Sequence, residues 1–264
     1  MKTTFFKKLV LVAAVLYLPL QSMAWGTQGH RICGQIAENY LTPKARAAVH
    51  AILGHESIAM ASNWADFIKS DPSFKYLSSW HYIDLNKKYT YPELVDFLKQ
   101  DTATDAYTKI HYLVGRLKNH EISKTEKLLD LRMLIHIVED VHQPMHVAHA
   151  DDQGGNGFKV QWFGKPSNLH SVWDSELIDN QQLSYTEYAK AIDHPTPAEV
   201  AKWEKDPISM WLFESNQISE VLYTEIQPND NLTYKYNFNH IDTLNRQLLK
   251  GGIRLAAVLN EIFG

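Results

Sequence analysis

Apolar residues recur with a helical period along most of this chain, so the pattern predicts a protein built mainly of α-helices. The clearest example covers residues 123–141, where Leu131, Leu134, Ile135 and Val138 lie on one face of the predicted helix. The same spacing predicts further helices over residues 44–53, 57–69, 103–118, 171–178, 195–205, 207–226 and 239–263. We therefore expect an all-α, mostly helical domain of about seven to nine helices.

The helical pattern stops at a glycine-rich segment, residues 154–157. Directly after it, residues 158–164 alternate between apolar and polar side chains, which is typical of a short strand. This predicts a small β-hairpin or ordered loop near residues 154–168. Repeats, low-complexity tracts and flexible linkers are absent from the sequence, so a single domain is expected.

The first 24 residues follow a different pattern. A short start with three lysines precedes an apolar run over residues 9–20 and small residues at positions 22 and 24. This order is typical of a cleaved secretory signal, and the run is shorter than the roughly 20 residues that span a membrane. We expect cleavage before Trp25, and a mature chain of residues 25–264 that is a secreted or periplasmic monomer without a membrane span.

Composition adds two constraints to this picture. The chain has 45% hydrophobic and 21% charged residues, as globular proteins do. After removal of residues 1–24, 23 Lys and Arg stand against 30 Asp and Glu, a net charge of −7. This charge argues against a protein that binds nucleic acid over a broad basic face. The 13 histidines beside a single cysteine favour metal binding by imidazole and carboxylate rather than by thiolate.

Two His–Asp pairs have the spacing that places both side chains on one face of a helix. His136 precedes Asp140 by four residues, and His170 precedes Asp174 by four. A single pair of this kind is more often a surface contact or a satisfied buried histidine. Pro144 ends or kinks the first helix and turns a nearby histidine, His146, in a new direction. Two pairs and this third histidine together favour a metal centre.

The start of the mature chain adds a chemical group of its own. An amino terminus at Trp25 has a pKa of about 8, and its amine and carbonyl oxygen can chelate a metal together with His30. By themselves these residues favour a frayed start with a chance histidine. Nine candidate ligands follow, which suit three metal ions: Trp25, His30, Asp66, His81, His136, Asp140, His146, His170 and Asp174. Nitrogen and oxygen ligands with open positions suit zinc.

These residues resemble the zinc-dependent S1/P1 nucleases, which are more distantly related to bacterial zinc-dependent phospholipase C. The resemblance rests on five motifs in family order: Trp25-Gly26-x-x-Gly29-His30, Trp64-Ala65-Asp66, His81-Tyr82-Ile83-Asp84, His136-x-x-x-Asp140-x-His142-Gln143-Pro144-x-His146 and Asn168-Leu169-His170-x-x-Trp173-Asp174. It implies a phospholipase C/P1 nuclease-like helical fold that holds three Zn²⁺ ions in a cleft.

The resemblance also implies how the ligands are shared. One zinc ion is held by Asp66, His81, His136 and Asp140. A second is held by the Trp25 amine and carbonyl with His30 and Asp140, and the third by His146, His170 and Asp174. Asp140 thus bridges two ions, and the resemblance favours the chelate reading of Trp25 and His30.

The implied reaction is hydrolysis of single-stranded DNA and RNA to 5′-phosphorylated products, with 3′-nucleotides as further substrates. The nucleophile is a hydroxide between two zinc ions, because zinc lowers the pKa of bound water to about 7. Asp66 orients it, and Lys69 replaces an expected arginine, which loosens phosphate positioning. Tyr82 stacks on a base, and Asp84 and Asn156 resemble polar contacts to base and phosphate, although a turn aspartate and a loop asparagine fit these positions equally well.

Two other functions remain open from the sequence. A phospholipase C would use the same metals but present an apolar, membrane-facing mouth, whereas Tyr82 and Asp84 favour the nuclease. A zinc-scavenging or zinc-stabilised binding protein would hold metal without turnover.

Overall fold

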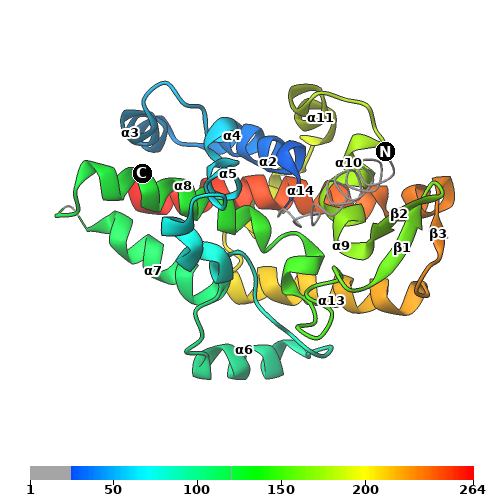
Figure 1. Cartoon of the computed structure of the whole chain (residues 1–264). Coiled ribbons are helices and arrows are strands. Elements are labelled where there is room, and N and C mark those ends of the chain that lie inside the picture. The colour runs from blue at the N-terminus through cyan, green and yellow to red at the C-terminus, as the bar shows by residue number, and fades with distance from the viewer. Residues whose placement is uncertain (1–24, 120) are drawn as a thin grey trace, which may run out of the picture.

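A computed structural model describes residues 25–119 and 121–264 of the chain. The 30-residue helix α14 (Tyr234–Phe263) runs through the middle of the molecule, with α2 (Thr27–Tyr40) and α8 (Lys124–Asp140) beside it (Figure 1). Helices α2 and α14 pack very closely at Gly252. A Cβ atom at this position would lie only 2.6 Å from the side chain of Ile36. Only glycine permits this approach, which sets the depth of α2 in the core.

Helix α8 has strong sequence signals at both of its ends. The Ser123 hydroxyl accepts a hydrogen bond from the Glu126 amide, and the Glu126 carboxylate accepts one from the Ser123 amide, which makes a capping box. Pro144 cannot continue the helix, and the short 3₁₀ segment η3 (Pro144–Val147) begins there. Because its C-terminal half is fully buried, α8 brings its last polar side chains into the interior.

The other helices cover this central group: α3 (Pro43–Leu53), α4 (Ile58–Ala61), α5 (Trp64–Ile68), the 3₁₀ helix η2 (Pro72–His81), α6 (Tyr91–Gln100), α7 (Ala106–Lys118), α9 (Leu169–Ser171), the π-helical turn η4 (Val172–Glu176), α10 (Leu177–Asp179), α11 (Tyr185–Ile192), α12 (Pro197–Trp203) and α13 (Ile208–Glu225). A small sheet lies at one end of the molecule (Figure 1). Its central strand β1 (Lys159–Trp162) pairs antiparallel with β2 (Lys165–Asn168), and parallel with β3 (Asn231–Leu232).

The mostly helical fold and the hairpin near residues 154–168 are confirmed. The continuous helix predicted over residues 57–69 is wrong: it is interrupted at Ser62, whose hydroxyl bonds to the Ile58 carbonyl and to Glu139 on α8. Helix α14 begins at Tyr234, five residues before the predicted start. Helices α6 and α11 were not predicted, because each is short and buries only two residues.

The expected signal segment, residues 1–24, lies outside the described residues. Within the described part of the chain, no helix is both long and apolar enough to cross a membrane.

Candidate metal centre

Three groups of buried histidines and aspartates have ligand atoms close enough to share a metal ion. The groups are His30, Asp66 and His136; His81, His136 and Asp140; and His146, His170 and Asp174. Helices α2, α5 and α8 supply the first group, η2 and α8 the second, and η3, α9 and η4 the third. All eight side chains that the sequence suggested as ligands are thus brought together.

Asp140 belongs to the second group and also faces His30 of the first group. One of its oxygens, Oδ2, is 2.9 Å from His81 Nδ1 and 3.2 Å from His136 Nε2. The other oxygen, Oδ1, is 3.4 Å from His30 Nε2. A carboxylate with each oxygen facing a different imidazole has the geometry to bridge two metal ions.

The third group is built around Asp174, which lies on the π-helical turn η4. Its Oδ2 atom is 3.0 Å from His170 Nε2, and its Oδ1 atom is 3.9 Å from His146 Nε2. The wider π turn is a local departure from α geometry of the kind that frequently occurs at functional sites.

Hydrogen bonds on the far side of the rings orient four of these histidines. Because a carbonyl oxygen or carboxylate accepts, the ring Nδ1 atom carries the proton, and Nε2 keeps the lone pair that a metal needs. The four acceptors are Glu139 Oε2 for His30 at 2.6 Å, Ser62 O for His136 at 2.5 Å, His81 O for His146 at 2.7 Å and Gly154 O for His170 at 2.6 Å.

Burial also prepares the site for cations. It lowers the pKa of His30, His81 and His146 well below the usual histidine value, so these rings are neutral at pH 7. Burial raises the pKa of Asp140 to about 6. Five buried side-chain atoms of the three groups have no hydrogen-bond partner among the described residues: His30 Nε2, Asp66 Oδ2, His81 Nε2, Asp140 Oδ1 and His146 Nε2. Unpaired buried donors and acceptors are costly, and nitrogen and oxygen ligands of this kind fit zinc.

Trp25 lies next to this centre and is fully buried. Its indole nitrogen donates to the backbone carbonyl of Glu139 at 2.9 Å. The amide of the following residue, Gly26, donates to the backbone carbonyl of Asp174 at 2.8 Å. The start of the predicted mature chain is therefore held between α8 and the turn that carries Asp174.

Three further residues support the candidate ligands, and none was predicted as a site residue: Glu139, Ser62 and Gln143, of which only Gln143 stands in a quoted motif. Glu139 faces His30 with one oxygen and accepts a hydrogen bond from Ser62 with the other at 2.9 Å. Gln143 donates its amide N–H to Asp174. The signal available in the sequence for Glu139 is its position four residues after Ile135, on the apolar face of the predicted helix, where an unpaired charge is unfavourable.

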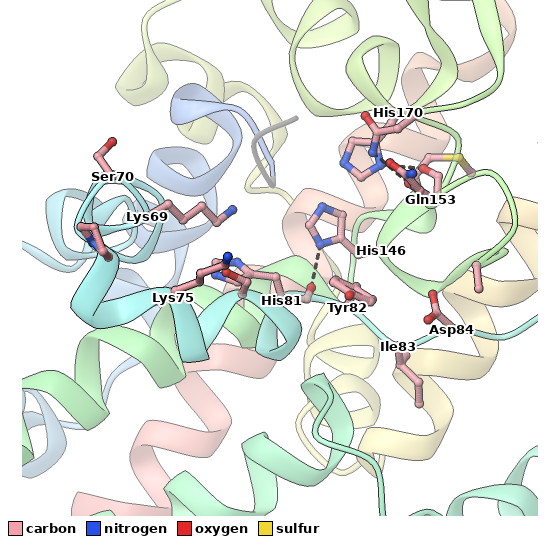
Figure 2. Close-up of a pocket in the computed structure, with 16 residues that line it drawn as sticks. Lys69, Ser70, Lys75, His81, Tyr82, Ile83, Asp84, His146, Gln153 and His170 are labelled. Carbon is pink, nitrogen blue, oxygen red and sulfur yellow. Dashed lines mark hydrogen bonds between the residues drawn. The ribbon is translucent and has the colours of Figure 1, made fainter. Parts of the chain in front are cut away.

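A pocket of about 800 Å³ opens over the centre. Its walls include His81, His146 and His170, together with the four residues expected to contact substrate: Lys69, Tyr82, Asp84 and Asn156. Figure 2 shows Lys69, Lys75 and His81 on one side and Gln153 and His170 on the other. Tyr82 is 42% exposed. Lys69 also pairs with Asp66, at 2.6 Å between Nζ and Oδ1.

The extended backbone after η2 explains how Tyr82 and Asp84 reach the pocket. Ile83 and Leu85 donate backbone hydrogen bonds to the carbonyls of His146 and Ala148, both at 2.9 Å, and both side chains are buried. Side chains alternate along extended backbone, so Tyr82 and Asp84 lie on the opposite side. Burial raises the pKa of the Asp84 carboxyl above its usual value.

The S1/P1 Nuclease family profile matches residues 25–264. Endonuclease 2 of Arabidopsis thaliana is 27% identical over 97% of this chain and 96% of its own length. Endonuclease 5 of the same plant is 29% identical over 97% of this chain and 96% of its own length. Nuclease P1 of Penicillium citrinum is 29% identical over 91% of this chain and 98% of its own length. The chain therefore belongs to the S1/P1 nuclease family and is an enzyme that cleaves phosphodiester bonds.

Proposed function

We propose that this chain hydrolyses the P–O3′ bond of single-stranded DNA and RNA, leaving 5′-phosphates, and that it also removes the phosphate of 3′-nucleotides. The observation that carries the proposal is the position of the three His/Asp groups, members of which line a pocket that also presents an exposed tyrosine and two lysines. The lysines at the pocket could contact the phosphates of a polyanionic substrate, and the tyrosine could stack on its flat bases.

We assign three zinc ions to the centre. Asp66, His81, His136 and Asp140 would hold one ion; His30, Asp140 and the amine and carbonyl of Trp25 a second; and His146, His170 and Asp174 the third. Zinc bound there would supply a water of lowered pKa and positive charge opposite the phosphate, in a chain whose mature form is otherwise acidic.

Asp66 is the residue that orients the attacking water in this proposal. Its Oδ1 atom is held by Lys69, while its Oδ2 atom is buried and has no partner among the described residues. A carboxylate oxygen has two lone pairs, so Oδ2 could contact a zinc ion and still accept a proton from a water beside it. Lys69 also presents its ammonium group to the pocket, where it would contact the phosphate as a point charge.

Tyr82 would stack on the base next to the bond that is cleaved. Stacking on an aromatic face gains about 1 to 3 kcal/mol and is tolerant of sequence. Asp84 lies beside Tyr82 and would read polar atoms of the base, whereas Asn156, on the loop across the pocket, would contact the phosphate. We further propose that the chain is exported, that cleavage before Trp25 creates the mature amino terminus, and that the mature protein is a monomer.

Product analysis tests the proposal. The mature, zinc-loaded protein is incubated with a single-stranded oligonucleotide, and 5′- and 3′-mononucleotides are resolved. We expect 5′-phosphates whose release stops when a chelator removes the metal and resumes when zinc is restored. Absence of cleavage in protein that has bound zinc would contradict a nuclease and favour phospholipid substrates.

The variant Asp66→Asn separates an enzyme from a protein that only holds zinc. Asparagine keeps an oxygen ligand, so we expect zinc to remain largely bound while hydrolysis falls at least a hundredfold. Metal content is measured by mass spectrometry of the metal and activity on the same sample. Unchanged hydrolysis would remove Asp66 from the mechanism.

A further inference from the structure

Helix α7 carries two half-buried cations and an exposed aromatic ring on one face. Lys109, Tyr112 and Arg116 follow at spacings of three and four residues, which places them in one row. The Lys109 ammonium lies 4.7 Å from the ring centre of Trp80 and 4.9 Å from that of Tyr112. The Arg116 guanidinium lies 5.7 Å from the Tyr112 ring.

The row continues onto η2, which forms the wall of the pocket. The Tyr112 ring packs edge-on against Trp80 at 6.2 Å, and Trp80 packs edge-on against Tyr76 at 6.0 Å. Tyr112 is 47% exposed and Tyr76 is 56% exposed, so each keeps part of its ring surface in solvent. We call Tyr76, Lys109 and Tyr112 the outer aromatic surface.

This surface lies on the same 3₁₀ helix as one wall of the pocket. Side chains three residues apart eclipse one another along a 3₁₀ helix, and three such positions on η2, Lys75, Ser78 and His81, all line the pocket, so Tyr76 and Trp80 lie on the neighbouring faces of the same helix. The first amide of α7, that of Ala106, donates to the backbone carbonyl of Tyr82 at 2.9 Å. Helix α7 therefore starts at the residue proposed to stack on a base and extends away from it for about 15 Å to Arg116.

The charges suit a polyanion. Among the described residues, Lys75 and Lys109 have no carboxylate within ion-pair distance. Arg116 is different, because its guanidinium pairs with Asp130 at 2.7 Å and with Glu126 at 3.2 Å, so its charge is largely balanced. Positive charge without a partner thus lies at the pocket wall and at the first turn of α7.

We propose that the outer aromatic surface binds nucleotides of a single-stranded substrate that flank the bond being cleaved. Tyr76 and Tyr112 supply faces for bases, and Lys109 lies against phosphates, which is how proteins bind single strands without reading sequence. This inference rests on the proposed function. It adds that long strands gain contacts that a dinucleotide cannot reach, so the enzyme prefers polymers.

The test compares two substrate lengths. For the double variant Lys109→Ala/Tyr112→Ala we expect kcat/KM to fall about tenfold on a 20-residue oligothymidylate and less than twofold on the thymidine dinucleotide. Tyr112→Phe keeps the stacking face and is expected to match the unaltered protein. Tyr234→Ala, which removes an exposed tyrosine that packs on Phe163 near the sheet, serves as the control and should change neither value.

Salt dependence gives a second readout. In the Asp66→Asn background, in which cleavage is expected to be at least a hundredfold slower, Lys109→Ala should flatten the slope of log affinity against log salt by about 0.7 for the 20-residue strand. Equal losses on both substrates, or an unchanged preference for the long strand, would overturn the inference while leaving the nuclease proposal intact. Failure of the unaltered protein to cleave or bind either strand would overturn both.

Discussion

At the residue scale, the metal centre depends on how each imidazole is held. A ring whose Nδ1 atom donates to a fixed acceptor can turn only Nε2 toward a metal. For His136, His146 and His170 that acceptor is a backbone carbonyl, whereas His30 uses the side chain of Glu139. A side-chain acceptor can be changed by mutation without altering the fold, which makes the orientation of His30 testable.

We predict that Glu139→Gln weakens zinc binding about tenfold to a hundredfold. The substitution replaces the carboxylate oxygen that faces His30 Nδ1 with an amide, which is a weaker acceptor, and it disturbs the bond from Ser62. Competition with a chelating dye measures the affinity for zinc independently of catalysis. The matched control is Glu220→Gln, which alters another Glu–His contact, with His149 at 2.6 Å, outside the three metal groups. Equal affinity in Glu139→Gln and the unaltered protein would contradict this role.

The residue identities in the centre were predictable from sequence to a large extent. The pairs His136–Asp140 and His170–Asp174 are separated by one helical turn, a local relationship that sequence spacing reports directly. Glu139 was not predicted, because a glutamate beside Asp140 on a helix is equally compatible with a position at the surface. Only the packing of α2 against α8 decides that Glu139 faces His30.

At the element scale, the long helices follow from their periodicity, helped in α8 by a capping box, and the short ones depend on their surroundings. Helix α6 has a clear capping box between Thr90 and Glu93, yet its ten residues bury only Leu94 and Leu98. The 3₁₀ helix η2 begins at a capping aspartate, Asp71, followed by Pro72, but its 3₁₀ shape depends on packing against α7 and α8. Such segments are short, so local propensity alone does not select them.

The second prediction concerns Trp25 and Gly26, the two residues directly before α2. The Trp25 amine exists only if the chain begins at that residue, and the buried Trp25 and the Gly26–Asp174 bond leave little freedom there. We predict that one or more residues retained before Trp25 lower hydrolysis at least tenfold. A cleavable extension provides the control, since its removal should restore activity in the same preparation. Full activity of the extended protein, with its intact mass verified, would show that the amine is not a ligand.

At the scale of the whole molecule, a buried ion network ties α13 to the central helix. Arg254 and Lys250 on α14 each lie 2.9 Å from the Glu214 carboxylate of α13. Arg254 is fully buried and also pairs with Asp206 at 2.7 Å and with His142 Nε2 at 3.2 Å. Because His142 is two residues beyond Asp140, this network braces the end of α8 that carries the metal ligands.

We predict that Glu214→Gln lowers the free energy of unfolding by about 2 kcal/mol at pH 7, because it leaves buried cations poorly paired. Burial alone would raise the pKa of Glu214, but Arg254 and Lys250 outweigh it and hold the pKa below its usual value. A lowered pKa stabilises the fold above the unfolded value near 4.5, and the contribution is lost as the pH falls through the folded value.

The difference between Glu214→Gln and the unaltered protein should therefore shrink as the pH falls below about 4.5. Urea unfolding at a series of pH values measures this difference in the free energy of unfolding. Metal-free proteins are used, because loss of zinc in acid would otherwise contribute to the result. Glu261→Gln, which alters an exposed pair with Lys118, should cost less than about 0.5 kcal/mol at every pH. A difference that is constant with pH would show that the Glu214 charge does not contribute.

The sequence by itself determined the helical class, the ends of α8 and the kinds of ligand available, because periodicity, caps and i, i+4 spacing are local properties. The tertiary structure decided which side chains meet. Asp140 lies between His30 and His81 only because α2, η2 and α8 pack at one place, and the same packing buries Glu139. Contacts between distant segments depend on the depth and angle of packing, as at Gly252, which no local pattern reports.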